Sequence, residues 1–420
     1  MIDLNKKYWF FLFPHSYRIV KGNKLLLYNT QNALYLQSEN QIFIKLIDQL
    51  SEKKNLGVMY LCDEYLKDKD CYCLIEDAIN KKIAGVQEFI DGIQKPLVFV
   101  PILNLQRDID KMIADNKSFI GDKLLTYLTN ANIYINSECD LACPDCTSYQ
   151  KQYKCCSKDE ELHDLEPEYV ELFLEQTRHS YLSKVNIIGG NILLYSHWSI
   201  LKQVLKKYDY EYHFWIHYKN LANDENIFSG FIENLIENDK IDIIVNFPME
   251  EQVLSKLISQ HKTHNNLTFH FLVENESHYE FVKCLEDKYP LNNFKIAPFF
   301  TGDNYTFLKE NIFTEKEDIL TEPIIMRKIF CNQKLNSNDF GVLNILPNGD
   351  VNANMNMDIL GNIKNDLLSK IIYEELTRNT AWRKIRNDKP CNDCLYQFLC
   401  PPISNYELAL GKPNLCHLNP

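Results

Sequence analysis

Residues 139–146 read CDLACPDC, which sets Cys139, Cys143 and Cys146 in a C-x3-C-x2-C spacing. The segment follows an alternating run at 132–136 that predicts a β-strand, so the cysteines are expected on a loop at the end of that strand. Three thiolates can bind three irons of a [4Fe–4S] cube and leave the fourth iron open to another ligand. Structural zinc takes four protein ligands instead, often as pairs of C-x2-C. The segment therefore predicts an iron–sulfur site with one open iron.

Strand-like and helix-like runs alternate after this loop. The strand-like runs lie at 132–136, 184–188, 213–217, 241–247, 267–273 and 294–299. The helix-like runs lie at 167–181, 197–208, 227–238, 251–261 and 278–288. Such alternation is typical of a parallel sheet, whose working residues lie at the carboxyl ends of the strands. The predicted fold class is therefore α/β, with six strand–helix units.

The rest of the chain predicts further domains around this one. Residues 1–95 carry three groups of signals: short strands at 17–20, 24–28 and 33–36, helical stretches at 39–50, 56–66 and 73–82, and a last strand at 83–86. A connector follows, and a charged stretch near 309–318 leads into a cysteine-rich end. We therefore predict domains at 1–95, 96–125, 126–305 and 306–420.

Composition limits the partners and the cellular location that can be expected. A net charge of −12 on 420 residues makes a nucleic-acid partner unexpected. No apolar run approaches the roughly 18 residues that a membrane span needs, so a cytoplasmic location without membrane contact is predicted. Disulfides are uncommon in that compartment, and seven of the 14 cysteines fall in two compact groups, which indicates metal binding.

The second group is Cys391, Cys394, Cys400 and Cys416. Four thiolates can close a complete [4Fe–4S] site. A structural zinc with four cysteine ligands is the alternative, because thiolate spacing alone does not choose the metal.

The loop at 139–146 resembles that of the radical S-adenosylmethionine (SAM) enzymes. The resemblance implies a partial (β/α)6 barrel, with SAM bound to the open iron and cleaved to a 5′-deoxyadenosyl radical. That family usually has an aromatic residue before the third cysteine, where this chain has Asp145.

Four further residues are candidates for contact with SAM. Gly189, Gly190 and Asn191 resemble the family's G-G-E-P motif, although Asn191 replaces the acidic residue and Ile192 the proline. Glycines let a main chain approach a ligand closely. Asn246 stands roughly where the family contacts the ribose, but a polar residue at a strand end is often only a turn former.

Cys155 and Cys156 are weak catalytic candidates. Some peptide epimerases of the family return a hydrogen atom from a cysteine. The alternative is that both are buried core residues, because free cysteine commonly behaves as a small apolar side chain.

The C-terminal cysteines resemble the end of the SPASM extension, which holds auxiliary clusters in peptide-modifying members. Ser404 and Asn354 stand in the regions where that pattern has further cysteines. The resemblance implies that one auxiliary [4Fe–4S] cluster is kept and the other is lost, which leaves Cys331 without a cluster.

Taken end to end, the chain resembles the radical-SAM peptide maturases of GG-Bacteroidales-type systems, which process ribosomally made natural products. Residues 1–95 resemble the winged-helix modules that bind a leader peptide, by strand addition to an exposed sheet edge. The resemblance implies a precursor peptide with a leader, a reduced flavodoxin or ferredoxin-type electron donor, and a crosslink, thioether or epimerisation as product.

The alternative function is a peptide-binding scaffold without catalysis. It is favoured by the departures from the family pattern, which are Asp145, Asn191, Asn354 and Ser404. The three intact cysteines of the first loop argue against it.

Overall fold

The computed structural model describes residues 6–99, 101, 107–114, 123–141, 143, 146–156, 158, 163–222, 239–261, 266–289 and 293–418. The predicted helix at 227–238, Asp145 and parts of the predicted connector 96–125 lie outside these residues.

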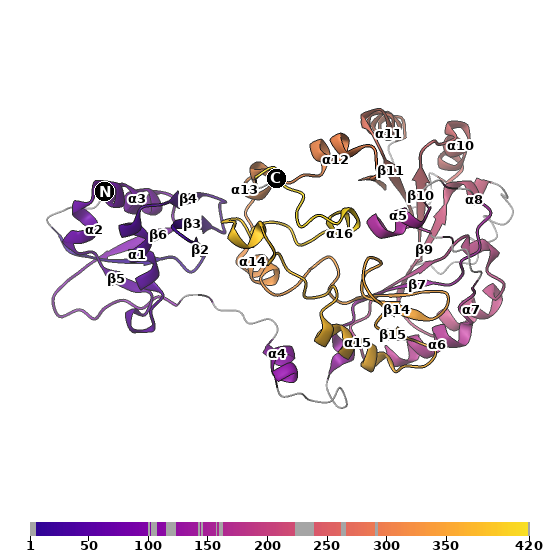
Figure 1. Ribbon diagram of the computed structural model, residues 1–420, viewed down its shortest axis with the longest axis horizontal. Helices are drawn as coiled ribbons and strands as arrows, with labels where there is room; N and C mark the ends of the chain where they lie inside the picture. Colours follow the sequence, from indigo (N-terminus) through magenta and orange to yellow (C-terminus); the bar gives the residue numbers. More distant parts are fainter. Residues whose placement is uncertain are drawn as a thin grey trace.

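The N-terminal part contains two three-stranded antiparallel sheets (Figure 1). One has the order β2 (Ser16–Lys21), β3 (Lys24–Asn29) and β4 (Tyr35–Ser38). The other sets β1 (Tyr8–Leu12) between β5 (Val58–Tyr60) and β6 (Ala84–Glu88). Apolar side chains of α1 (Gln41–Leu50), α2 (Asp63–Lys67) and α3 (Lys69–Asn80) share one core with these strands.

The predicted helix at 56–66 is wrong in its first half. Residues 58–60 form β5, in which Tyr60 pairs with Trp9 of β1, and the helix begins only at Asp63. A strand of three residues is too short to show an alternating pattern, and its pairing depends on a partner almost fifty residues away. The strand β1 was likewise not predicted.

Six parallel strands form most of the nine-stranded sheet and confirm a large parallel sheet. They are β7 (Asn130–Tyr134), β8 (Lys184–Ile188), β9 (Glu211–His217), β10 (Lys240–Asn246), β11 (Leu267–Val273) and β12 (Phe294–Pro298). The predicted bounds of β8 and β11 are confirmed at both ends, and the other four lie within two residues of the prediction.

Helices follow the strands, as predicted. They are α5 (Cys146–Gln152), α6 (Pro167–Gln176), α7 (Trp198–Leu205), α8 (Tyr218–Ala222), α10 (Glu251–His261) and α11 (Glu276–Lys288). The predicted helices at 167, 197, 251 and 278 are confirmed, and the one at 251–261 agrees at both ends.

The two faces of the parallel sheet differ. Alternate strand residues such as Ile133, Ile187 and Ile243 pack against α6, α7, α10 and α11. The residues between them point to the other side, because successive side chains of a strand alternate. This inner face is the side that carries Tyr134, Ile188, Trp215, Ile244 and Leu272, and α5 lies over it with Tyr149.

The sheet continues beyond β7 with three strands that were not predicted. β13 (Val342–Ile345) runs parallel to β7, and β14 (Asp350–Asn352) and β15 (Gly361–Asn362) follow antiparallel. The remaining helices are α4 (Arg107–Ala114), α12 (Tyr305–Asn311), α13 (Lys316–Leu320), α14 (Met326–Asn332), α15 (Leu368–Arg378) and α16 (Asn405–Leu410). No helix among the described residues is long and apolar enough to cross a membrane.

The N-terminal strands pack against the C-terminal segment. Side chains of β2 and β3 share an apolar cluster with Ile319, Ile329 and Leu399. Lys21 Nζ donates to the carbonyl oxygen of Asn392 at 2.6 Å, beside the C-terminal cysteines. The first and last parts of the chain therefore lie side by side (Figure 1).

Candidate functional site

The three cysteines of the first loop lie near one another at the carboxyl end of β7. All three are partly buried, and Cys146 is the first residue of α5. Burial and the charges of Cys156, Cys146 and Cys139 raise the pKa of the Cys143 thiol to about 12. The Cys146 sulfur also accepts a hydrogen bond from the Lys158 N–H at 3.3 Å. Such thiols ionise only when a cation neutralises them, as a bound metal does.

The glycines at the end of β8 fit closely against this loop. The Gly190 N–H donates to the carbonyl oxygen of Asn136 at 2.9 Å. A Cβ on Gly190 would lie 2.2 Å from the carbonyl oxygen of Glu138, immediately before Cys139. The two glycines therefore position the base of the cysteine loop, a role additional to the predicted contact with SAM.

Replacing Gly190 with alanine should therefore disturb the loop. We expect the free energy of unfolding to fall by about 1–3 kcal/mol, the usual range for overpacking a filled site. Denaturant unfolding measures this, and iron content after reconstitution should fall with it. Gly92 is the control, because no atom lies within 4 Å of its Cβ position and only its φ of +83° resists alanine. Full iron content in the Gly190 variant would contradict the positioning role.

Asn136 supplies an acceptor that the sequence pattern did not single out. Its side-chain amide donates to the carbonyl oxygen of Asn191 at 2.9 Å, while its Oδ1 is buried without a partner among the described residues. The Cβ position of Gly189 lies 2.0 Å from that oxygen. Buried polar atoms normally have a partner, so this acceptor could take a hydrogen bond from a donor group of a bound ligand.

Asn191 is engaged in a local turn. Its side chain accepts from the Leu193 N–H at 3.1 Å and caps the short 3-10 helix Ile192–Leu194. The side chain is buried, so the structure gives it a capping role beside the loop.

Asn246 lies beside Cys143, held by two other side chains. His217 Nε2 donates to Asn246 Oδ1 at 2.7 Å, and Asn246 Nδ2 donates to the Tyr149 hydroxyl at 3.2 Å. The same amide lowers the pKa of Cys143 by a hydrogen bond to the thiol. Hydrogen bonds to ligand sulfurs tune iron–sulfur sites. His217 and Tyr149 were missed in the sequence, where histidines show no ligand spacing.

His217 makes the stability of this site dependent on pH. Burial lowers its pKa from 6.5 to about 4, and its Nδ1 accepts from the Lys219 N–H, as a neutral imidazole can. Between pH 6.5 and about pH 4, His217 is protonated in the unfolded chain but neutral in the folded protein. The free energy of unfolding should therefore fall by about 3 kcal/mol as the pH drops from 7 to 4.

Urea unfolding at several pH values measures that fall. The variant His217→Gln lacks the titrating group and should lose about 3 kcal/mol less than the unmodified protein over the same range. Parallel pH curves for the two proteins would contradict the assignment.

Cys155 and Cys156 are buried, 3.7 Å apart between their sulfurs. They pack with Tyr134, Trp215 and Phe299 on the inner face, as core residues do. Cys156 also lies close enough to the first loop for its charge to raise the pKa of Cys139, Cys143 and Cys146. The core interpretation fits both, while a role in hydrogen return stays a prediction.

Deeper on the inner face, polar side chains form a buried chain. The Tyr153 hydroxyl lies 2.7 Å from His270 Nδ1, and His270 Nε2 lies 2.5 Å from Asp242 Oδ1. Asp242 Oδ2 lies 2.6 Å from His213 Nδ1, and His213 Nε2 is hydrogen-bonded to Glu211. Burial alone would raise the pKa of Asp242, but the hydrogen bonds from the two histidines hold it well below its usual range.

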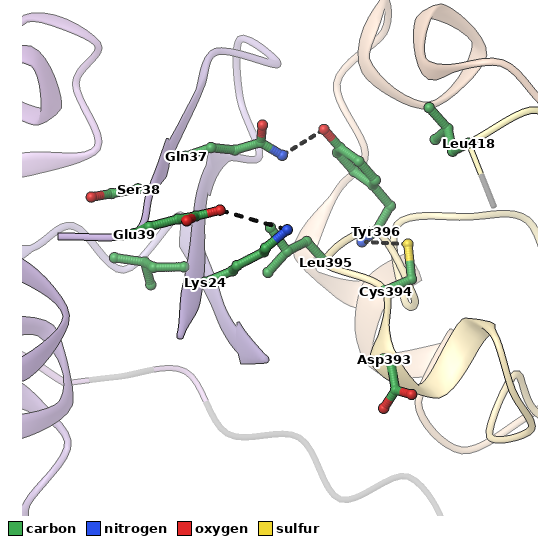
Figure 2. A pocket seen from close by; sticks show the side chains of 10 residues that line it. Lys24, Gln37, Ser38, Glu39, Asp393, Cys394, Leu395, Tyr396 and Leu418 are labelled. Carbon is green, nitrogen blue, oxygen red and sulfur yellow. Dashed lines mark hydrogen bonds and ion pairs between the residues drawn. The ribbon is translucent and has the colours of Figure 1, made fainter. Parts of the chain in front are cut away.

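The four C-terminal cysteines are also partly buried and close in space. Burial raises the pKa of Cys400 to about 12, and the charges of Cys391, Cys394 and Cys416 act on it in the same direction. The sulfurs of Cys394 and Cys416 accept backbone N–H groups at 3.4 and 3.2 Å. Figure 2 shows Cys394 at the wall of a cavity of about 510 Å³ that Lys24 and Gln37 of the N-terminal sheet also line.

The positions where further cysteines were expected have structural roles. Ser404 caps α16 by accepting from the Glu407 N–H, and Asn354 donates to Asp339 and Asn405. Cys331 lies in α14 and is not among the groups that shift the pKa of the Cys391 and Cys400 thiols.

No set of three or more His, Cys, Asp or Glu side chains within the described ranges converges closely enough to hold a single metal ion. Thiolates of a cube bind different irons and need not converge on one point. The donor set, which is all sulfur with backbone N–H groups directed at it, suits an iron–sulfur cluster and also zinc.

Comparisons with known proteins give only distant likenesses. No family model matches the chain, and no curated protein matches it. SuiB of Streptococcus suis, solved bound to S-adenosylmethionine and also bound to its precursor peptide SuiA, is 13% identical over 97% of this chain and 98% of its own, with a TM-score of 0.42. The enzyme anSMEcpe with bound AdoMet is 12% identical over 68% of this chain and 92% of its own, with a TM-score of 0.45. Identities and TM-scores this low leave function to be argued from the residues.

Proposed function

We propose that this chain is a radical-SAM enzyme that modifies a ribosomally made precursor peptide. The observation that carries the proposal is the placement of Cys139, Cys143 and Cys146, which lie together at the carboxyl end of the first parallel strand. The carboxyl edge is where parallel α/β sheets place their working residues. We assign the six parallel strands and their helices to the partial barrel of such enzymes.

Within that site each residue has a distinct task. The three thiolates would hold the cluster, with Asn246 donating to the Cys143 sulfur. The unpartnered Oδ1 of Asn136 would accept from the amino group of SAM beside Gly189. A [4Fe–4S] cluster held there would supply the electron for cleavage of SAM, the chemistry by which a hydrogen atom could be removed from the peptide. Cys155, Tyr149 and Trp215 exclude water from the space beside it.

The leader peptide would bind to the N-terminal part. β4 is an outer strand, paired only with β3 among the described residues. A cavity of about 550 Å³ lies between β4 and the end of α3, where Leu74, Asp77 and the C-cap residue Lys81 line it. An extended peptide that pairs with the free edge of β4 would place its side chains in this cavity.

Hydrogen exchange tests this partner. A precursor peptide with its leader should slow exchange of the outward-facing amides of β4, and the same peptide without its leader should not. Protection confined to other elements would contradict strand addition at β4.

We propose that the C-terminal four cysteines hold one auxiliary [4Fe–4S] cluster, which accepts or relays an electron. Structural zinc remains the competing occupant. The peptide-binding scaffold is the competing function, and the capping role of Asn191 favours it, because that side chain is already engaged.

One experiment separates these possibilities. The protein is purified and reconstituted without oxygen, then incubated with SAM and dithionite, and 5′-deoxyadenosine is assayed. About eight irons per chain with SAM cleavage supports the enzyme with two clusters. About four irons, with zinc present and cleavage intact, keeps the enzyme and assigns zinc to the C-terminal site. Absence of iron at the first loop and of cleavage would leave the scaffold.

A further inference from the structure

A small polar cavity lies between the parallel sheet, α5 and the C-terminal segment. Its volume is about 140 Å³, room for roughly five waters or one small side chain. Asn132 and Asn344 of the sheet line it, together with Lys154 just past α5 and Asp339, Asn354 and Asn405 of the C-terminal segment. The cavity therefore adjoins the helix that begins at Cys146.

The carboxamide wall is fixed by its own hydrogen bonds. Asn132 Nδ2 donates to Asn344 Oδ1 at 2.6 Å, and Asn344 Nδ2 donates to Asn352 Oδ1 at 2.8 Å. On the C-terminal side, Asn354 Nδ2 donates to Asp339 at 2.8 Å and to Asn405 at 2.7 Å. A wall held in this way offers a preformed shape to a polar ligand.

Lys154 is the cationic residue of the lining. Among the described residues its ammonium has no hydrogen-bond or ion-pair partner and lies 5.3 Å from the centroid of the Trp215 ring. Asp242 is the nearby anion, but both of its oxygens are already occupied by His213 and His270. Lys154 therefore carries a charge that no neighbouring residue neutralises by direct contact.

The surrounding charges favour an anion. Burial and the neighbouring Lys184 lower the pKa of Lys154 to about 8, so most molecules keep the charge at pH 7. Lys295 adds to the positive field. Burial raises the pKa of Asp339 to about 7, so this carboxyl group is about half protonated at pH 7 and repels an anion less than a fully ionised carboxylate would.

We propose that this cavity binds the carboxylate side chain of an aspartate or glutamate in the peptide substrate, with Lys154 as its counter-ion. The identity of the ligand as a peptide residue rests on the proposed function. Binding here would fix one residue of the peptide next to α5 and the loop from which it starts.

A titration of the full-length protein with propionate tests the cavity directly. Propionate labelled with ¹³C at the carboxyl group mimics a glutamate side chain, and NMR reports its binding. Propionamide is the neutral control of the same size. We expect propionamide to bind at least tenfold more weakly, and Lys154→Met to weaken propionate binding at least tenfold. Lys206→Met, which removes an exposed lysine outside the lining, should change it less than twofold.

Equal affinity for the two probes, or unchanged propionate binding in Lys154→Met, would overturn the proposal. Displacement of propionate by saturating SAM would also overturn it, because the cavity would then belong to the cofactor. The melting temperature of Lys154→Met should not fall, since the change removes an unpaired, partly buried charge. If that variant does not fold, Lys154→Gln replaces it in the same titration.

Failure of the proposed function would look different. SAM cleavage without peptide does not require the cavity, so propionate binding with no SAM cleavage would refute the enzyme and keep the anion site. SAM cleavage with no selective propionate binding would keep the enzyme and refute the anion site.

Discussion

Replacing Cys143 with alanine is expected to remove about four irons per chain and to abolish 5′-deoxyadenosine formation. Two remaining thiolates cannot hold three irons of a cube. Cys143 accepts a hydrogen bond from Asn246, and the charges of Cys139 and Cys146 both raise its pKa. Its loss therefore also removes the thiol that connects these groups. Iron analysis after anaerobic reconstitution and an assay of SAM cleavage measure the two effects.

Cys156→Ala is the matched control. That thiol is also buried beside the loop, but it lies outside the C-x3-C-x2-C spacing. It should keep the iron and the cleavage activity. Iron retained in the Cys143 variant, or lost in the Cys156 variant, would mean that the ligand set differs from the one that the spacing predicts.

The parallel strands could be predicted because each carries its own signal. Residues 184–188 and 267–273 are runs rich in β-branched and aromatic residues, bounded by helical stretches. β5 and β13–β15 could not be predicted in this way. They have two to four residues each, and their pairing with distant strands decides their conformation.

The residues of the candidate site also divide into those with a local sequence signal and those that depend on distant neighbours. The cysteines were found because spacing is a local property of the sequence. Asn136, His217 and Lys154 were not found, because their significance depends on the groups that surround them in space. The sequence singled out Gly190 because glycine lets the main chain approach a ligand closely. The structure adds a second reason, which is that the Glu138 carbonyl passes too close for a side chain at this position.

Replacing Glu407 with glutamine is expected to lower the free energy of unfolding by about 3–5 kcal/mol, the usual effect of breaking a buried ion pair. Glu407 and Arg386 are almost fully buried and form two bonds, of 2.6 and 3.1 Å. Arg386 also donates to the carbonyl oxygens of Pro401 and Pro402, which follow Cys400. The variant would leave a buried guanidinium without its counter-ion, and chemical denaturation measures the loss.

Glu171→Gln is the control for the loss of charge alone. Glu171 pairs with Lys207 at the surface, where an ion pair contributes about 1 kcal/mol or less. A similar loss in both variants would contradict the special role of the buried pair.

Glu407→Gln should also affect how much metal the C-terminal cysteines bind. Arg386 lies close enough to Cys391 and Cys400 to lower the pKa of both thiols, and Glu407 fixes its position. Glu407→Gln should therefore release metal from this site while Cys139, Cys143 and Cys146 keep theirs. A fall from about eight irons to about four would identify the released metal as a cluster, whereas loss of zinc at constant iron would identify the zinc site. Retention of all metal would show that the ion pair stabilises α16 without supporting the cysteines.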